Sequence, residues 1–370
     1  MPGSHTWPQM TPLTLTSLQD LRTLDADTII DVRAPSEYAE DHLPGAINLP
    51  VLNDAERAKV GTIYTQDSPF NARKIGGALV AKNTAHHLET ALADKDGSWQ
   101  PLVYCWRGGQ RSGAFSTILD QVGWRVRLLK GGYQSYRRAV VKTLYDTPLA
   151  HRLILIDGGT GTAKTELLHH LAAAGAQTLD LEGLAAHRGS LFGGVAADQP
   201  AQKMFESRIA AALTHLDPEQ VTFVEAESSK IGERLIPPSL WENMRRSPRV
   251  HLSAPLDARS GYLCRAYSDL TQDSGRLDRL IDQLRPYHSA EQIAHWHERA
   301  GAGDWHVLAR SLIADHYDPR YEKSAARQSN VVEHLALPDL EPETLAQTAK
   351  RLMVAFSQAS ACQSLSTAGQ

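Results

Sequence analysis

A glycine-rich segment at residues 158–165 constrains the fold of this chain more than any other feature. Its sequence, Gly-Gly-Thr-Gly-Thr-Ala-Lys-Thr, follows an apolar run at 153–156 and opens a helical pattern at 164–174. A strand, a glycine-rich loop and a helix in this order form a P-loop, whose backbone amides and helix N-terminus bind phosphate. The segment therefore predicts an α/β domain with a phosphate or diphosphate site at the end of one strand.

Within this loop each residue type has an expected role. Lys164 supplies positive charge, and Thr165 stands where a hydroxyl would bind Mg²⁺. Ala163 replaces the glycine usual before the lysine; its methyl group would be tolerated only if the local backbone is right-handed, and the replacement counts against tight nucleotide hydrolysis. The predicted diphosphate-binding residues are Gly158, Gly159, Thr160, Gly161, Thr162, Ala163, Lys164 and Thr165.

Two acidic residues follow the next predicted strand of this domain, at 221–224. Glu225 and Glu227 are candidates to order a metal ion or a water molecule, and surface acids at a strand end are the alternative. Asp180 and Glu182, which end the strand predicted at 177–181, are weaker candidates. The histidines lack a matching ligand set, so no metal site is assigned with certainty. We expect no tightly bound cofactor, and Mg²⁺ is the metal we would test.

A single cysteine in a second loop predicts reactive sulfur chemistry. Cys105 follows the strand predicted at 102–104 and precedes a helix predicted at 113–122. Loop amides and the helix dipole stabilise an anion there, and Arg107 and Arg111 add positive charge, so the thiolate is favoured. The remaining residues of the loop are Trp106, Gly108, Gly109, Gln110 and Ser112.

Strands and helices alternate through the first part of the chain as well. Short strands are predicted at 28–32, 102–104 and 125–129, which indicates a mainly parallel sheet. An Asp-Thr-Pro sequence at 146–148 breaks the preceding helix. We therefore predict an N-terminal domain at 1–147 and a P-loop domain at 148–370, whose sequence turns helical after about residue 283.

A locally basic stretch follows the cysteine. The whole chain has a net charge of −4, but residues 105–142 carry eight basic residues and only Asp120 as an acid. Interleaved aromatic residues could stack on bases, although a solvated basic helix with core aromatics is the alternative. The candidate tRNA-contacting residues are Arg125, Arg127, Lys130, Tyr136, Arg137 and Arg138.

The first domain resembles rhodaneses. The resemblance lies in Asp31-Val32-Arg33, Glu37-Tyr38 and the segment 42–48, His-Leu-Pro-Gly-Ala-Ile-Asn. It implies that Asp31 and Arg33 brace the active-site loop and that Cys105 carries sulfur or selenium. Five residues separate Cys105 from Arg111, one more than in the usual rhodanese loop. That spacing is similar to cysteine phosphatases, although Tyr104 stands where those enzymes usually have histidine.

A rhodanese-like domain followed by a P-loop domain resembles the tRNA 2-selenouridine synthases over residues 17–320. The resemblance is carried by segments 60–64, 105–112, 158–165, 179–185, 187–190, 224–228 and 230–232.

This resemblance implies a transferase with two activities on the wobble 2-thiouridine of tRNA. Geranyl diphosphate alkylates the sulfur, and selenophosphate then supplies the selenium that replaces it. Cys105 would form a selenyl-cysteine intermediate in a loop whose Arg107 and Arg111 hold selenophosphate. The P-loop would bind the diphosphate. The expected partners are the Lys, Glu and Gln tRNAs that carry 2-thiouridine, and an enzyme that supplies selenophosphate.

Other readings stay open at this point. The main alternative is a small-molecule kinase or ATPase with a rhodanese-like sulfurtransferase or regulatory module; a binding module and a cysteine phosphatase are the others. The three cysteines are odd in number and widely spaced, which argues against disulfides. With neither an apolar span nor a signal sequence in view, we expect a cytoplasmic enzyme without a membrane span.

Overall fold

The computed structural model describes residues 11–194, 198–325 and 330–367. The chain divides into two compact units, the first made of Met1–Pro148 and Pro200–His215 and the second of Leu149–Gln199 and Leu216–Gln370. Each contains a five-stranded parallel sheet with helices, so the predicted fold class is confirmed. Within the described residues, no helix is long and apolar enough to cross a membrane.

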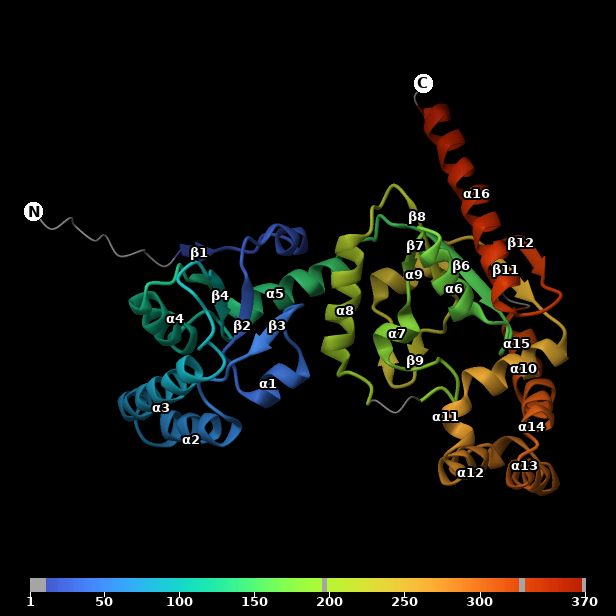
Figure 1. Ribbon diagram of the computed structural model, residues 1–370, viewed down its shortest axis with the longest axis horizontal. Helices are drawn as coiled ribbons and strands as arrows, with labels where there is room; N and C mark the ends of the chain where they lie inside the picture. Colours follow the sequence, from blue (N-terminus) through green and yellow to red (C-terminus); the bar gives the residue numbers. More distant parts are fainter. Residues whose placement is uncertain (1–10, 195–197, 326–329, 368–370) are drawn as a thin grey trace, which may run out of the picture. The chain divides into compact units, whose positions relative to one another are not determined.

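The sheet of the first unit has the strand order β1-β5-β4-β2-β3. Figure 1 labels β1, β2, β3 and β4 of this sheet. The strands are parallel throughout, so the residues that follow β4 and β2 lie at the same edge. The strands are β1 (Thr11–Leu13), β2 (Thr28–Asp31), β3 (Ala46–Asn48), β4 (Pro101–Tyr104) and β5 (Arg127–Leu129).

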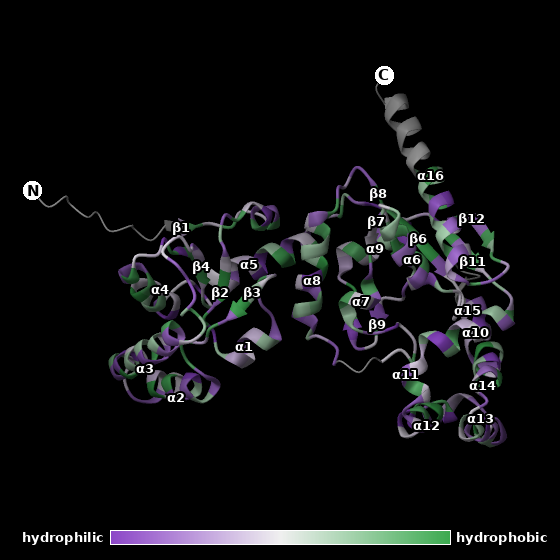
Figure 2. Ribbon diagram, in the orientation of Figure 1, coloured by the Kyte–Doolittle hydropathy of each residue, from purple (hydrophilic) through white to green (hydrophobic). Residues whose placement is uncertain are grey.

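Helices α3 and α4 bury side chains against this sheet. Val80 of α3 and Phe115 and Leu119 of α4 join the core formed by the strands. Helices α2 and α3 mix hydrophilic and hydrophobic residues, as Figure 2 shows. The helices of this unit are η1 (Leu18–Thr23), α1 (Pro35–Glu40), α2 (Asp54–Gln66), α3 (Pro69–Glu89), α4 (Gln110–Val122), α5 (Gly132–Val141), η2 (Lys142–Asp146) and α8 (Gln202–His215).

Helix α8 was placed by the sequence in the second domain, yet it packs with the first unit against α5, η1 and η2. Glu206 of α8 is buried and accepts hydrogen bonds from Arg137 and from the Tyr145 hydroxyl. Ser207 donates to Asp41 at 3.0 Å. These polar partners are far from α8 in sequence, which is why no local pattern indicated this packing.

The second unit has the strand order β12-β11-β6-β8-β7, with all strands parallel. Strand β12 was not foreseen, because the sequence beyond residue 283 was expected to be helical. The strands are β6 (Arg152–Gly158), β7 (Gln177–Leu179), β8 (Val221–Glu225), β11 (Arg249–Ser253) and β12 (Val331–Ala336), beside a small hairpin of β9 (Lys230–Ile231) and β10 (Arg234–Leu235).

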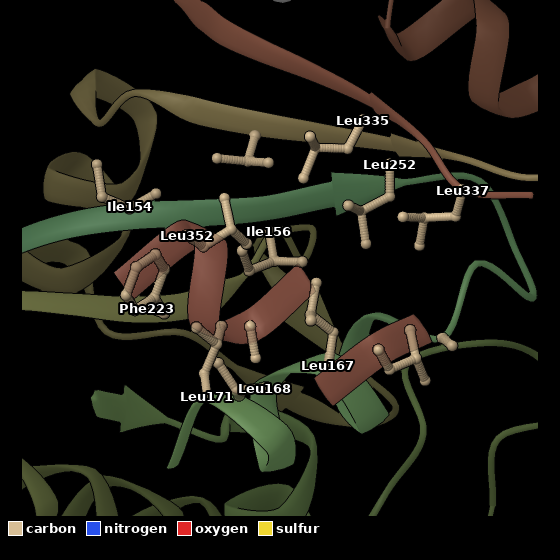
Figure 3. Close-up of a cluster of buried hydrophobic side chains, with 14 of the residues drawn as sticks. Ile154, Ile156, Leu167, Leu168, Leu171, Phe223, Leu252, Leu335, Leu337 and Leu352 are labelled. Atoms are coloured by element: carbon tan, nitrogen blue, oxygen red, sulfur yellow. The ribbon is translucent and has the colours of Figure 1, made fainter. Parts of the chain in front are cut away.

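Helices α6 and α16 form one core with the sheet of this unit. Figure 3 shows Ile154, Ile156 and Phe223 of the strands lying with Leu167 of α6 and Leu352 of α16. Burying these side chains fixes α6 against β6, and α6 is the helix that the P-loop opens.

The remaining helices of the second unit include a lobe with its own core around Trp296, Leu308 and Leu312. The helices are α6 (Lys164–Ala173), α7 (Leu181–Ala185), α9 (Pro238–Arg246), α10 (Leu256–Ala266), α11 (Ser268–Thr271), α12 (Ser274–Asp282), η3 (Arg285–Tyr287), α13 (Ala290–Ala302), α14 (Trp305–Ser311), η4 (Leu312–Tyr317), α15 (Asp318–Ala325) and α16 (Pro342–Thr367).

Candidate active sites

Cys105 lies at the carboxyl end of β4, where the chain turns into α4. Its side chain is 3% exposed, and its Sγ accepts hydrogen bonds from the Gly109 amide at 3.3 Å and the Ser112 hydroxyl at 3.1 Å. Both donors belong to the loop and the first turn of α4. The sulfur is therefore held by donors that stabilise a thiolate.

These contacts change the acidity of the thiol. Burial acts to raise the pKa of Cys105, but hydrogen bonds from Ser112 and Gly109 and the charge of Arg111 outweigh it, so the pKa lies below its ordinary value. A thiolate at this position is a nucleophile that a merely packed cysteine would not provide.

Glycines let helix α5 approach the cysteine loop closely. The amides of Tyr133 and Gln134 donate to the carbonyl oxygens of Cys105 and Trp106, at 2.8 and 3.0 Å. A Cβ on Gly132 would lie 2.3 Å from the Cys105 carbonyl oxygen, and Gly132 has a φ of +56°. A side chain at Gly132 is therefore incompatible with this contact.

The two arginines of the loop differ in their surroundings. Arg111 is largely buried and donates to both carboxylate oxygens of Glu37, at 2.7 and 3.3 Å. Burial acts to raise the pKa of Glu37, but its contacts with Arg111 lower it below the ordinary value. Arg107 is exposed. Arg107 is thus open to an incoming anion, whereas Arg111 already has a carboxylate partner, Glu37, that lies far from it in the sequence.

The other predicted loop residues lie around the cysteine. The Trp106 ring is half-buried and its centroid is 5.3 Å from that of Tyr133. Gly108 has a φ of +67° and lies against the backbone of Leu129. Gln110 begins α4 and is exposed.

Asp31 and Arg33 form a fully buried ion pair, with a shortest contact of 2.6 Å. Arg33 also donates to the Asp41 carbonyl oxygen, and its guanidinium carbon lies 4.1 Å from the centre of the Tyr133 ring. Because Tyr133 is hydrogen-bonded to the Cys105 carbonyl, the pair is linked to the loop through one residue. The bracing role of Asp31 and Arg33 remains a prediction, now with a route of contact.

The structure separates the basic stretch into outward and inward residues. Arg125, Lys130 and Arg138 are exposed. Arg127 is half-buried and pairs with Asp25 at 3.2 Å. The three exposed residues remain available to a polyanion.

Two members of the predicted tRNA-contacting set face inward instead. Tyr136 is 1% exposed, so it offers no ring face to a base, and that part of the prediction is corrected. Arg137 is paired with the buried Glu206, which neutralises its charge. Both residues stabilise the packing of α5 and α8, a role that periodicity alone could have suggested for Tyr136.

The P-loop joins β6 to α6 as the sequence predicted. Lys164 Nζ donates to the Gly158 carbonyl oxygen at 3.0 Å, and the Thr162 hydroxyl donates to that of Gly159 at 2.8 Å. Arg259 of α10 donates twice to the Thr160 carbonyl oxygen, at 2.9 and 2.7 Å, and so holds the outer side of the loop. No local sequence pattern indicates this role for Arg259.

Ala163 adopts a left-handed backbone, with φ 58° and ψ 35°. The right-handed backbone that would accommodate its methyl group without strain is therefore not the conformation found. The residue is 2% exposed, and it caps the N-terminus of α6. A non-glycine residue costs roughly 1–2 kcal/mol in this conformation, so the P-loop is strained at the position before its lysine.

Glutamates meet beside Lys164 and Thr165. The Thr165 hydroxyl donates to Glu182 at 3.0 Å. Burial, together with the nearby charge of Glu227, raises the pKa of Glu182 to about 8. Burial also raises the pKa of Glu227. Glu182 had been ranked as the weaker candidate, but it is the acid that contacts the P-loop directly.

Glu225, the other predicted acid, points into the fold. It is fully buried and accepts a hydrogen bond from the Leu181 amide at 3.2 Å, and burial raises its pKa well above the ordinary value. Glu225 therefore orders the start of α7 rather than facing the P-loop. Among the described residues, no group of three or more His, Cys, Asp or Glu side chains could hold a metal ion.

A cavity of about 500 Å³ opens over the P-loop. Residues of the loop from Thr160 to Glu166 line one side of it. Glu182, Arg188 and Glu227 line the other parts, together with tyrosines of α10 and the helical lobe. Loop amides, Lys164 and Arg188 make this cavity suitable for an anionic group such as a diphosphate.

Two family models match the chain. A rhodanese-like domain matches residues 14–139, and the model described as the tRNA 2-selenouridine synthase AAA domain matches residues 151–279.

Curated relatives with the same name match across both units. The tRNA 2-selenouridine synthase of Nitrosomonas europaea is 36% identical, with 70% of this chain and 69% of that protein covered. The synthase of Cupriavidus pinatubonensis is 31% identical, with 82% and 91% covered. The synthase of Pseudomonas putida is 32% identical, with 85% and 92% covered. The resemblance seen in the sequence is confirmed, and the chain belongs to the tRNA 2-selenouridine synthase family.

Proposed function

We propose that this protein converts 2-thiouridine at the wobble position of tRNA to 2-selenouridine in two steps, geranylation and then selenation. The observation that carries the proposal is the presence, in one chain of this family, of two loops with different chemistry. One is a thiolate-favouring loop around Cys105, and the other is a P-loop around Lys164.

The first step uses the P-loop. The sulfur of 2-thiouridine attacks the first carbon of geranyl diphosphate, a C–S bond forms, and the C–O bond to the diphosphate breaks. The ring proton of the thiouridine is released, and diphosphate leaves with the bonding electrons. Lys164 and the loop amides stabilise the charge that develops on this leaving group.

The second step uses Cys105. Its thiolate attacks the selenium of selenophosphate, so that an S–Se bond forms and the Se–P bond breaks, with its electron pair staying on phosphorus as phosphite. The terminal selenium then attacks the C2 carbon of the S-geranyl base, and geranyl thiol leaves. A low-molecular-weight thiol attacks the Cys105 sulfur, which leaves selenium on the nucleoside; a second thiol restores the cysteine.

Arg107 suits the role of holding selenophosphate, because it is exposed beside the loop. Arg111 suits a different role, because its pairing with Glu37 fixes the first turn of α4. The exposed residues Arg125, Lys130 and Arg138 would contact tRNA phosphates. Mg²⁺, if it takes part, would arrive with the diphosphate at Thr165.

Nucleoside analysis of tRNA tests the proposal. A 2-thiouridine tRNA is incubated with the protein and a thiol, with each donor added separately and then together. Geranyl diphosphate alone should give S-geranyl-2-thiouridine, and both donors should give 2-selenouridine. Unchanged 2-thiouridine in every reaction, with ATP hydrolysis in the absence of tRNA, would favour a P-loop ATPase instead.

A further inference from the structure

A second, apolar cavity continues from the one over the P-loop. The two cavities share Thr160, Ser190, Leu263, Tyr267 and Tyr317 in their linings. Beyond these shared residues the second cavity is lined almost entirely by hydrocarbon and aromatic side chains of the helical lobe. They include Phe192, Leu270, Leu277, Leu308, Ala309 and Leu312.

We propose that this apolar cavity binds the hydrocarbon chain of a prenyl diphosphate whose diphosphate lies on the P-loop. The inference rests on the proposed function for the identity of the chain, but the position and character of the cavity come from the structure alone. In this proposal the hydrocarbon end of the substrate lies in the helical lobe, and its charged end lies on the loop between β6 and α6.

Polar side chains line the first cavity and apolar side chains line the second, which is the arrangement needed to bind a molecule with one charged end and one hydrocarbon end. Lys164, Thr165 and Arg188 lie in the phosphate cavity. At the shared boundary, the Ser190 hydroxyl lies 3.3 Å from that of Tyr267, and the Arg188 guanidinium carbon lies 4.8 Å from the centre of the Tyr267 ring. Polar groups thus end at Tyr267, and the apolar lining begins there.

The boundary residues are fixed in place by their own contacts. Arg188 pairs with Asp269 at 2.9 Å, which holds it over the tyrosine ring. Thr160 belongs to the P-loop and also lines the apolar cavity, and Arg259 anchors its carbonyl oxygen. With a diphosphate bound at the P-loop, the hydrocarbon chain attached to it would pass Thr160 and enter the apolar cavity directly.

The apolar cavity is small, with a volume of about 80 Å³. Apolar chain burial against leucine and aromatic side chains would add binding free energy that inorganic diphosphate lacks.

Ala309 offers a position from which to block the cavity. It lies on α14 among the lining residues and is half-buried. Val307 on the same helix is 46% exposed and does not line the cavity, so Val307→Phe adds the same side chain outside it. Comparing Ala309→Phe with Val307→Phe distinguishes blocking of the cavity from a general effect of a phenylalanine on α14.

The test measures binding of geranyl diphosphate and of inorganic diphosphate to the full chain. The unmodified protein should bind geranyl diphosphate more tightly than inorganic diphosphate. Ala309→Phe should weaken geranyl diphosphate binding by roughly tenfold or more and leave inorganic diphosphate unchanged, whereas Val307→Phe should change neither. The inference would be overturned if the unmodified protein bound both ligands with equal affinity. It would also be overturned if Ala309→Phe bound geranyl diphosphate as tightly as the unmodified protein does.

Cys264 provides a second measurement that needs no substitution. Its side chain is half-buried and lines the same cavity. Geranyl diphosphate should slow alkylation of Cys264 by N-ethylmaleimide, read from the peptide mass, while inorganic diphosphate should not. Equal alkylation rates with the two ligands would contradict the inference.

These results can be told apart from failure of the proposed function. If geranyl diphosphate protects Cys264 and Ala309→Phe loses affinity, but no S-geranyl nucleoside forms, the cavity assignment stands and the tRNA reaction falls. If the nucleoside forms while both measurements are unaffected, the reaction stands and the cavity assignment falls.

Discussion

The backbone amide of Tyr133 donates a hydrogen bond of 2.8 Å to the carbonyl oxygen of Cys105. The ring of the same tyrosine lies on the buried guanidinium of Arg33, and its hydroxyl donates to Asp41 at 2.7 Å. Tyr133 therefore connects the cysteine loop to the Asp31–Arg33 pair. The position of the reactive sulfur depends on how closely α5 approaches β4.

Gly132→Ala should disrupt this approach, because its Cβ would lie 2.3 Å from the Cys105 carbonyl oxygen and 2.5 Å from the Gly108 amide nitrogen. Both neighbours are backbone, so the loop must move. We expect selenium incorporation to fall by at least about tenfold while geranylation continues. The control is Gly113→Ala in α4, where a Cβ meets nothing within 4 Å. Equal selenation by the two variants would contradict the role given to Gly132.

Ser112→Ala should raise the pKa of Cys105, since it removes the 3.1 Å hydrogen bond to Sγ that lowers this pKa. A higher pKa leaves less thiolate near neutral pH, so the pH profile of Cys105 alkylation should shift to higher pH. Ser116→Ala, a buried hydroxyl on the same helix, is the matched control and should leave the profile unchanged. Superimposable profiles for Ser112→Ala and the unmodified protein would refute the prediction.

Ala163→Gly should stabilise the second unit by less than about 1 kcal/mol, because glycine relieves roughly 1–2 kcal/mol of left-handed strain but loses a buried methyl group that contributes about 0.8 kcal/mol. Ala172→Gly, an exposed position near the end of α6, should instead destabilise it by up to about 1 kcal/mol. Urea denaturation of both variants measures the difference. A loss of stability in Ala163→Gly would show that the strain argument is wrong.

The contribution of Glu182 to the stability of the second unit should fall as pH rises from about 4.5 to about 8. The pKa of Glu182 is raised from 4.5 to about 8 by burial and by the charge of Glu227. In that interval the native state keeps a proton that the unfolded chain has lost, so this group makes the free energy of unfolding decrease by at most about 1.4 kcal/mol per pH unit.

Glu182→Gln removes this titration and should flatten the slope, as measured by urea denaturation across the same pH interval. Exposed Glu219 gives a control, and Glu219→Gln should keep the slope of the unmodified protein. If Glu182→Gln keeps that slope as well, Glu182 is not the titrating group.

Much of the fold and both reactive loops could be predicted from the sequence, because each depends on local order. A strand, glycines and a helix start are adjacent in the chain at both Cys105 and Lys164. The family resemblance joined the two loops into one enzyme.

The remaining features depend on contacts between distant residues. Glu37 meets Arg111, Ser207 meets Asp41, and Arg259 meets the Thr160 carbonyl, and no local pattern indicates these pairs. The burial of Tyr136 was misjudged, and the backbone conformation of Ala163 was left open, for a related reason. Both follow from tertiary packing, which sets side-chain exposure and backbone conformation independently of the neighbouring sequence.

The most direct test of the account compares the tRNA nucleosides made by Cys105→Ala and Lys164→Ala, with geranyl diphosphate, selenophosphate and a thiol all present. Cys105→Ala should accumulate S-geranyl-2-thiouridine without 2-selenouridine, because only the selenium carrier is lost. Lys164→Ala should leave mostly unmodified 2-thiouridine, because the diphosphate is no longer held. Equal loss of geranylation in both variants, or 2-selenouridine formed by Cys105→Ala, would contradict the assignment of the two steps to two sites.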